Sequence, residues 1–339
     1  MASPCRAIVV GYVVALLITW LMAGHISGQA VSDTPTLTFS GADSLGLTPA
    51  VTAQLQQSLK AQDYVAAERL LLPEIEQDPY STHAAQLLAF LGGVYFLDRD
   101  YFHAAVAWKK SEAIAPLQTP VEFSLAMAYI QLGHSDWARG VLESLANQNP
   151  KDALYPYWLG RLDFAAHSYS DAIRHFKDAI SLAPGMAQAY DNLGLCQYHL
   201  NQNDLAVQSF TKAIDLDRTR PHPSAWPYLN LGVTLRLLNR PTDAEANLQD
   251  AIRLDPKFPQ AHFQMGAVLD DLGQTKAAIN ELREAALLDP NYAEPHFVLA
   301  RIYRKLGQTA AARKEVQTYL HLRGHSDSGV PPAEDKTLH

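Results

Sequence analysis

A regular pattern of small, apolar and polar positions runs through most of the chain. The small residues are Gly92, Ala126, Gly160, Gly194, Gly232, Gly266 and Ala300, and the intervals between them are 34, 34, 34, 38, 34 and 34 residues. Twelve residues after each of them comes an alanine, at Ala104, Ala138, Ala172, Ala206, Ala244, Ala278 and Ala312. Twenty-four residues after five of them comes a proline, at Pro116, Pro150, Pro184, Pro256 and Pro290. Self-similarity at a period of this length indicates a repeat architecture.

Each repeat is predicted to be a pair of helices that pack against each other. Around Gly194, helical spacing places one stripe at Tyr190, Leu193 and Gln197. The segment that follows carries the facing stripe, at Leu205, Phe210, Ala213 and Ile214. Proline ends the second helix because it lacks an amide hydrogen and clashes with the preceding turn. One hairpin cannot bury its own apolar face but stacked hairpins can, so the pattern predicts an all-α solenoid.

These residues resemble the tetratricopeptide repeat (TPR) family. The family pattern has an aromatic residue at position 4, leucine at 7, glycine or alanine at 8, tyrosine at 11, alanine at 20, an aromatic at 24, alanine at 27 and proline at 32. The unit that starts at Ala187 matches at Tyr190, Leu193, Gly194, Ala206, Phe210 and Ala213, and departs at Gln197 and Arg218. The resemblance implies a right-handed α-solenoid of about eight hairpins over residues 48–322, with units starting near residues 48, 85, 119, 153, 187, 225, 259 and 293.

The two ends of the chain do not follow the repeat. Residues 1–30 carry one charge before an apolar run over residues 7–24, and Gly28-Gln29-Ala30 places small residues where a signal peptidase would cut. This pattern predicts a secretory signal peptide or, as the alternative, an uncleaved anchor in the inner membrane. We expect residues 31–47 to be a flexible leader and residues 323–339 to be a disordered polar tail. The array is therefore expected to act after export, in the periplasm or as a secreted protein.

Composition and motifs argue against nucleic-acid binding and catalysis. The formal net charge is -8 and no long basic run occurs, whereas phosphate binding needs clustered positive charge. The two cysteines are Cys5 and Cys196, so removal of the N-terminal segment would leave no intramolecular disulfide. The sequence lacks the common nucleophile, zinc-protease and phosphate-loop motifs. We therefore expect no catalytic residue, no metal site and no cofactor.

The family resemblance implies where a partner would bind. Positions 2, 5, 6, 9, 12 and 13 of each unit line the inner wall of such arrays, and the candidate contacts there are Tyr157, Trp158, Phe164, Asn192, Tyr198, Trp226, Asn230, Arg236, Gln264, Arg301 and Arg304. The amides share position 6 and could pair with an extended peptide backbone, although asparagine is also common there in the family. Tyr157 and Trp158 are extra to the family's core positions, although rings at helical spacing are often core residues. The basic residues of the last unit, with Lys305, are a weaker candidate for carboxylate capture.

One interval is four residues longer than the others, and three prolines lie within it. The segment 216–232 contains Pro221, Pro223 and Pro227. We expect a longer loop between two units there, because loop insertions of this size are inexpensive. If the segment has a binding role, Trp226 at position 2 is its best candidate contact.

Together these patterns predict a non-enzymatic scaffold that binds another protein or an extended peptide along its inner wall. The alternative is an assembly factor of an envelope complex, such as pilus, secretion or outer-membrane machinery, that acts by docking or self-association. A membrane contact is expected only if the N-terminal segment is uncleaved. The sequence leaves the partner and the oligomeric state open.

Overall fold

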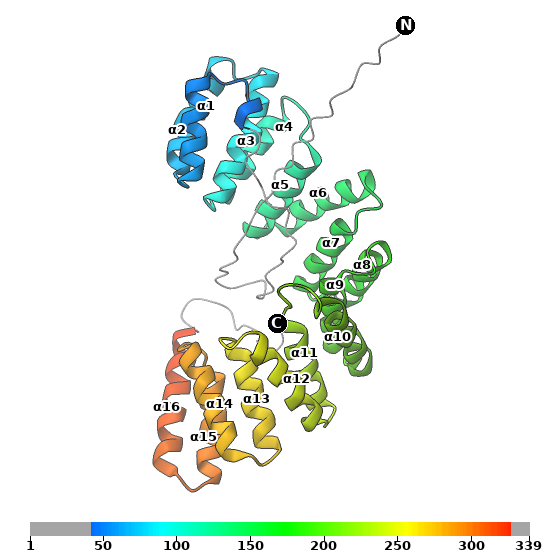
Figure 1. Ribbon diagram of the computed structural model, residues 1–339, viewed down its shortest axis with the longest axis vertical. Helices are drawn as coiled ribbons and strands as arrows, with labels where there is room; N and C mark the ends of the chain where they lie inside the picture. The colour runs from blue at the N-terminus through cyan, green and yellow to red at the C-terminus, as the bar shows by residue number, and fades with distance from the viewer. Residues whose placement is uncertain (1–41, 327–339) are drawn as a thin grey trace. The chain divides into compact units, whose positions relative to one another are not determined.

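The computed structural model describes residues 42–326, and this part of the chain is built from helices alone (Figure 1). It contains sixteen α-helices and one short 3-10 helix, so the predicted all-α repeat fold is confirmed. The predicted signal or anchor segment, residues 1–30, lies outside the described residues. Within residues 42–326, none of the helices is both long enough and apolar enough to cross a membrane.

The chain divides into two compact units, and the boundary falls between Leu162 and Asp163. The described part of the first unit holds η1 (Ala42–Ser44), α1 (Pro49–Lys60), α2 (Tyr64–Gln77), α3 (Thr82–Leu97), α4 (Tyr101–Glu112), α5 (Thr119–Gln131) and α6 (Ser135–Gln148). The helix α7 (Leu154–Ala165) spans the boundary. The second unit holds α8 (Tyr169–Leu182), α9 (Ala187–His199), α10 (Asn203–Asp217), α11 (Trp226–Leu237), α12 (Pro241–Leu254), α13 (Pro259–Asp271), α14 (Thr275–Leu288), α15 (Glu294–Lys305) and α16 (Thr309–Ser326).

The recurring glycines explain how closely the two helices of a hairpin approach. A Cβ atom on Gly194 of α9 would lie 2.6 Å from the ring of Phe210 in α10. The same relation recurs sixteen residues apart in three other hairpins, for the pairs Gly92–Trp108, Gly232–Leu248 and Gly266–Leu282. Real Cβ contacts are longer than this because interiors are already close-packed. A glycine in the first helix therefore makes room for a large side chain of the second.

The turn inside each hairpin contains one residue in the left-handed conformation. These residues are Gln62, Arg99, Gly133, His167, Asn201, Asn239, Gly273 and Gly307, with φ between 56° and 76°. The backbone then closes the helix end: in the second hairpin the amide of Asp100 donates to the carbonyl of Tyr95 at 2.9 Å. This is the Schellman arrangement, in which glycine or asparagine is usual at the left-handed position. The hairpin turn is thus the same in all eight pairs of helices, even where the residue there is not glycine.

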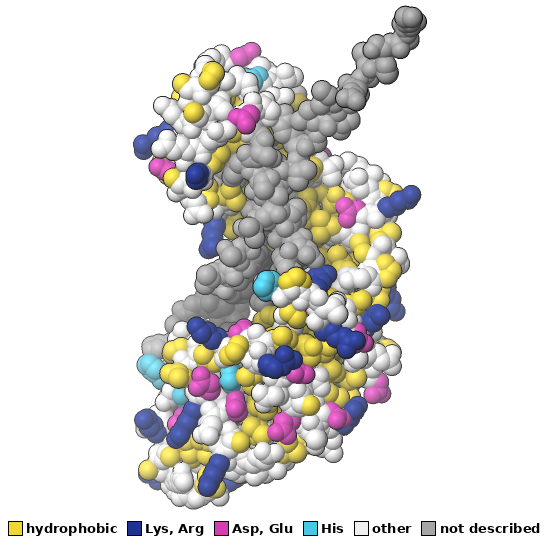
Figure 2. All heavy atoms as spheres, viewed as in Figure 1, with side chains coloured by type: hydrophobic (Ala, Val, Ile, Leu, Met, Phe, Trp, Pro, Cys, Tyr) yellow, Lys and Arg dark blue, Asp and Glu magenta, His cyan; other side chains and the backbone are white. Residues whose placement is uncertain are grey.

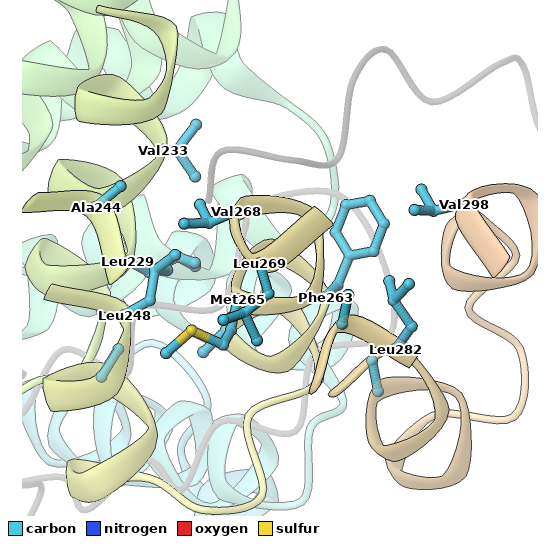
Figure 3. Packing of buried hydrophobic residues seen from close by; sticks show 14 of the residues in the cluster. Leu229, Val233, Ala244, Leu248, Phe263, Met265, Val268, Leu269, Leu282 and Val298 are labelled. Carbon is cyan, nitrogen blue, oxygen red and sulfur yellow. The ribbon is translucent and has the colours of Figure 1, made fainter. Parts of the chain in front are cut away.

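The hydrophobic core of the second unit is continuous from one hairpin to the next. In Figure 3, Met265 and Leu269 of α13 lie toward Leu229 and Leu248 of the preceding hairpin, while Phe263 lies on the side of Val298. The helix α13 is therefore packed on both sides. This arrangement is what the repeat requires, because a hairpin alone would leave one of these faces in water.

The longer interval forms an ordered connection between α10 and α11. Asp217, at the end of α10, is buried, and its carboxylate accepts a hydrogen bond from the amide of Ser224. The guanidinium of Arg220 lies 3.5 Å from the same carboxylate. The helix α11 begins at Trp226, whose amide donates to the Ser224 hydroxyl at 3.3 Å. One buried carboxylate thus holds the added residues as a compact loop.

At both ends the structure is more regular than the sequence patterns suggest. Residues 42–47 fall in the range predicted as a flexible leader, but Ala42 and Leu45 are buried in the core of the first unit. At the other end, α16 continues to Ser326, into the range predicted as a tail. Residues 327–339 lie outside the described part of the chain.

Candidate protein-binding surface

The first helices of successive hairpins lie side by side in the second unit. The helix α11 contacts both α9 and α13, and α13 also contacts α15. We call the surface formed by these four helices the first-helix face. It carries the predicted contacts Asn192, Tyr198, Trp226, Asn230, Arg236, Gln264, Arg301 and Arg304. The structure therefore brings most of the predicted inner-wall residues onto neighbouring helices.

The amides of this face are buried rather than open. Asn192, Asn230 and Gln264 are each at most 5% exposed. The amide nitrogen of Asn192 donates to the carbonyl of Gln188 at 2.8 Å, within its own helix. That of Asn230 donates to the carboxylate of Asp191 on α9 at 3.0 Å. The oxygen of the Asn230 amide is buried and has no hydrogen-bond partner among the described residues.

The basic residues of the face are largely paired with carboxylates of the same face. The side chain of Asp270 in α13 is 6% exposed and accepts hydrogen bonds from Arg301 at 3.0 Å and Lys305 at 3.3 Å. Its neighbour Asp271 accepts one from Arg236 at 2.6 Å. These bonds weaken the expectation that the basic residues of the last repeat capture a partner's carboxylate. The charges of Arg301 and Lys305 are already compensated within the chain. In Figure 2, basic and acidic side chains are interspersed in the lower part of the view, where α11–α16 lie.

Several predicted aromatic contacts are part of the packing between helices. Trp226 is half-buried, and its ring lies 4.6 Å from that of Phe258 at the start of α13. Phe164, also half-buried, lies 5.6 Å from the ring of His199. Tyr198 packs at the edge of the same core. These rings can therefore support the first-helix face, and only their outer edges are open to a partner.

In the first unit, Tyr157 and Trp158 are core residues, which corrects the expectation that they stand outside the core. Both are at most 3% exposed. The ring of Trp158 meets that of Phe123 of α5 at 6.3 Å and that of Tyr157 at 6.0 Å. The family positions account for packing within one hairpin. They miss these rings because the burial comes from aromatic residues of the neighbouring first helix.

Polar ties between the two helices of a hairpin were not anticipated from the sequence. His262 bonds to Glu281 at 2.7 Å and His296 to Glu315 at 2.6 Å, in both cases nineteen residues apart. A second kind of tie spans twelve residues, in the pairs Asp163–His175 and Gln197–Ser209. In all four hydrogen bonds, the residue from the second helix occupies position 23 of its repeat. A polar residue at position 23 was the sequence feature that could have predicted these bonds.

Cys196 belongs to this interior and not to a reactive site. It lies in α9 and is fully buried, and burial raises the pKa of its thiol well above the ordinary value. The thiolate is the reactive form of cysteine, so this residue is inert in the folded chain. Among the described residues, no three histidine, cysteine, aspartate or glutamate side chains are grouped to hold a metal ion.

The imidazole of His262 is expected to make stability depend on pH. Its Nδ1 lies 2.7 Å from Glu281 and its Nε2 lies 3.1 Å from the carbonyl of Pro256, so both nitrogens face acceptors. Only the imidazolium can donate from both. The bond to Glu281 raises the pKa of His262, against the opposing effect of burial. Protonation therefore stabilises the fold at low pH, and this contribution is lost as pH rises through the raised folded-state pKa.

This expectation is tested by urea unfolding of the wild type and of His262→Phe between pH 5 and 9. The wild type should lose stability relative to the variant as pH rises above about 6.5, the ordinary histidine value. The difference between the two proteins isolates His262 from other titrating groups, including the nearby Glu284. A difference that is constant across this range would contradict the assignment. Phenylalanine is the suitable replacement because family members carry an aromatic residue at this position.

Models of the tetratricopeptide repeat match two segments of the chain, residues 185–257 and residues 271–326. Among curated proteins, the human protein O-mannosyl-transferase TMTC3 is 30% identical over 107 residues, which are 31% of this chain. The matched part is only 11% of that relative's own length. The likeness is therefore confined to a segment of the larger protein.

Solved structures share the fold over longer stretches. A tetratricopeptide repeat protein from Parabacteroides merdae is 14% identical, with a TM-score of 0.58, and the match covers 80% of this chain and 98% of that one. PilW, described as a widely conserved type IV pilus biogenesis factor, is 22% identical with a TM-score of 0.56, over 62% of this chain and 95% of its own. PilF of Pseudomonas aeruginosa is 17% identical with a TM-score of 0.55, over 61% and 92%. At these identities the likeness concerns the fold.

The matched segments, the hairpin geometry and the solved relatives agree with one another. The glycine-to-large-residue contact and the left-handed turn recur through the described helices, including those outside the matched segments. This chain therefore carries tetratricopeptide repeats in residues 185–257 and 271–326, within an all-α repeat fold that the solved structures share.

Proposed function

We propose that this protein is a non-enzymatic scaffold that binds an extended peptide segment of another protein across its first-helix face. The observation that carries the proposal is the side chain of Asn230. Its amide oxygen is buried and unpaired among the described residues, and its amide nitrogen is held by Asp191. A buried acceptor without a donor is unfavourable, so a ligand that supplies one gains affinity.

The neighbouring carboxylate fixes which way this amide faces. A carboxylate of Asp191 only accepts hydrogen bonds, so the NH₂ group of Asn230 must point toward it. The oxygen then points away from Asp191 and is left without a donor among the described residues, a need that a backbone N–H of a ligand would meet. An extended peptide presents such groups whatever its sequence, and main-chain hydrogen bonds are a common source of affinity for peptides. The proposed ligand is therefore recognised through its backbone at this point.

The proposed site of action is outside the cytoplasm. The basis is the apolar run of residues 7–24, which is followed by the small residues Gly28 and Ala30. This location also favours a second candidate function, assembly of an envelope complex by docking or self-association. The fold likeness to PilW and PilF is compatible with both candidates and does not distinguish them.

Selection of peptides on the purified full-length protein would test the proposed function. A random peptide library should yield enriched sequences, and Asn230→Ala should weaken their binding by up to about tenfold, the effect of one lost hydrogen bond. The control is Asn247→Ala, which removes a half-buried amide from the second helix α12. Both variants are compared with the wild type by fluorescence anisotropy, with circular dichroism to verify folding. Absence of enrichment, or equal affinity of the wild type and Asn230→Ala, would overturn the proposal.

A further inference from the structure

Two buried hydrogen-bond donors on α7 lack acceptors. They are the indole nitrogen of Trp158 and the Nη1 nitrogen of Arg161, and neither has a hydrogen-bond partner among the described residues. Trp158 is 3% exposed and Arg161 is 7% exposed. Both belong to the first unit of the chain. Their separation of three residues places them on the same side of the helix.

The two side chains form one local arrangement. The guanidinium carbon of Arg161 lies 4.8 Å from the centre of the Trp158 ring, in a cation–π contact. Phe123 of α5 packs against the same indole, and Tyr155 packs against Phe123 at 6.2 Å. The ring face compensates part of the cation's charge but provides no acceptor for its N–H groups. The donors are therefore set in aromatic surroundings of low polarity.

A buried arginine without an ion pair is unusual in proteins and in the described part of this chain. Buried charges are normally paired, because removing a charge from water is unfavourable without a counter-charge. Two carboxylates in the described part of the chain follow the rule: Asp217 is buried beside Arg220, and Asp270, whose side chain is 6% exposed, is bonded to Arg301. Arg161 departs from it, as no ion pair of its guanidinium is found within residues 42–326. The missing group is an acceptor that carries negative charge.

We infer that Trp158 and Arg161 form a subsite for a carboxylate of the bound protein or peptide. The inference rests on the proposed function, since it describes a contact of the same kind of ligand with another first helix. A carboxylate supplies two acceptor oxygens for the two donors, and its single charge balances that of Arg161. A phosphate carries about −1.5 to −2 charges and would leave an excess in these surroundings. Water could accept both hydrogen bonds but would leave the charge unbalanced.

The test uses peptides selected on the full-length wild-type protein from a random library. Selected peptides that bind to the first compact unit should carry aspartate or glutamate at one fixed position. A selected peptide is then synthesised with glutamate and with glutamine at that position. The wild type should bind the glutamate form at least tenfold more tightly in fluorescence anisotropy. Arg161→Gln should bind both forms equally, at the affinity that the wild type shows for the glutamine form.

Two further variants separate the proposed contact from a structural role. Arg69→Gln removes an exposed arginine from α2 of the same unit and should keep the full preference for glutamate. Trp158→Phe keeps a ring but removes the indole N–H, and it should reduce the preference several-fold. Circular dichroism verifies that each variant is folded. Amidation of the peptide's C-terminus should leave the preference for glutamate unchanged, because the preference reports a side-chain carboxylate.

The possible failures can be told apart. Enriched peptides without an acidic preference would overturn the subsite while leaving the proposed function in place. If Arg161→Gln weakened the binding of the glutamate and glutamine forms equally, the subsite would also be overturned. That result would show that Arg161 supports the fold and does not contact the carboxylate. A library that yields no enriched peptide would overturn both the subsite and the proposed function.

Discussion

Replacing Gly92 with alanine is expected to lower the free energy of unfolding by about 3 kcal/mol, the upper range for an overpacked core. The new Cβ would lie 2.5 Å from Cδ1 of Trp108 and 2.7 Å from its Cε2. The indole cannot move aside easily, because it is buried and its nitrogen donates to the carbonyl of Ala89 at 2.9 Å. The helices α3 and α4 must therefore separate to admit one methyl group. Urea unfolding followed by circular dichroism measures the effect.

The adjacent glycine provides a matched control. A Cβ on Gly93 would meet nothing within 4 Å, although this residue occupies the same helix. Alanine there should stabilise the protein by up to about 1 kcal/mol, because glycine is the poorer helix former. Two identical substitutions at neighbouring positions should thus have opposite signs. Equal shifts of the two unfolding midpoints would show that helix propensity, and not the approach to Trp108, governs this hairpin.

The substitution Leu282→Ala should destabilise the second unit by about 2–5 kcal/mol, the range for a leucine removed from a closed core. Leu282 of α14 is fully buried and lies next to α13 in the cluster shown in Figure 3. A cavity forms there because the first helices on both sides hold α13 in place. The control is Leu287→Ala in the same helix, where the side chain is 72% exposed and the expected change is small. The measurement is again the unfolding free energy in urea.

A double-mutant cycle with Gly266 adds a test of the packing itself. Gly266→Ala alone should be destabilising, since its Cβ would lie 2.6 Å from Cγ of Leu282. In the double variant the new methyl group occupies part of the space that the leucine leaves. The combined loss should therefore be smaller than the sum of the two single losses. Additive losses would mean that the two positions do not share one contact.

The repeat was predictable because its signal lies in residues whose role is steric. Glycine or alanine at position 8 is required wherever a large residue sixteen positions later points at it, as in the pairs Gly194–Phe210 and Gly266–Leu282. This contact recurs in four of the described hairpins at a constant separation of sixteen residues, so the spacing reveals the fold. The compact loop at Asp217 was less predictable, because its order depends on one carboxylate that bonds to Ser224.

The binding surface was predictable only in part. Sequence positions placed Asn230 and Gln264 on adjacent helices but gave no indication of their burial, which depends on neighbouring hairpins. The core positions of the repeat pattern do not include Trp158, so it was predicted to lie outside the core. In the structure its ring packs against Phe123 of another hairpin. The pairing of Arg301 with Asp270 was missed for the same reason, since it joins residues of two hairpins. Contacts between repeats carry little signal in the pattern of a single repeat.

The left-handed turn residue has a consequence for how the chain can change in length. Seven residues separate the small residue of the first helix from this turn, as between Gly92 and Arg99 or between Gly194 and Asn201. Five more lead to the alanine of the second helix, and neither interval varies among the seven regular repeats. The extra residues of the irregular interval lie between hairpins. Each hairpin is therefore a structural module of fixed length. Insertion, deletion or duplication can occur in the connections between hairpins without disturbing the packing inside a hairpin.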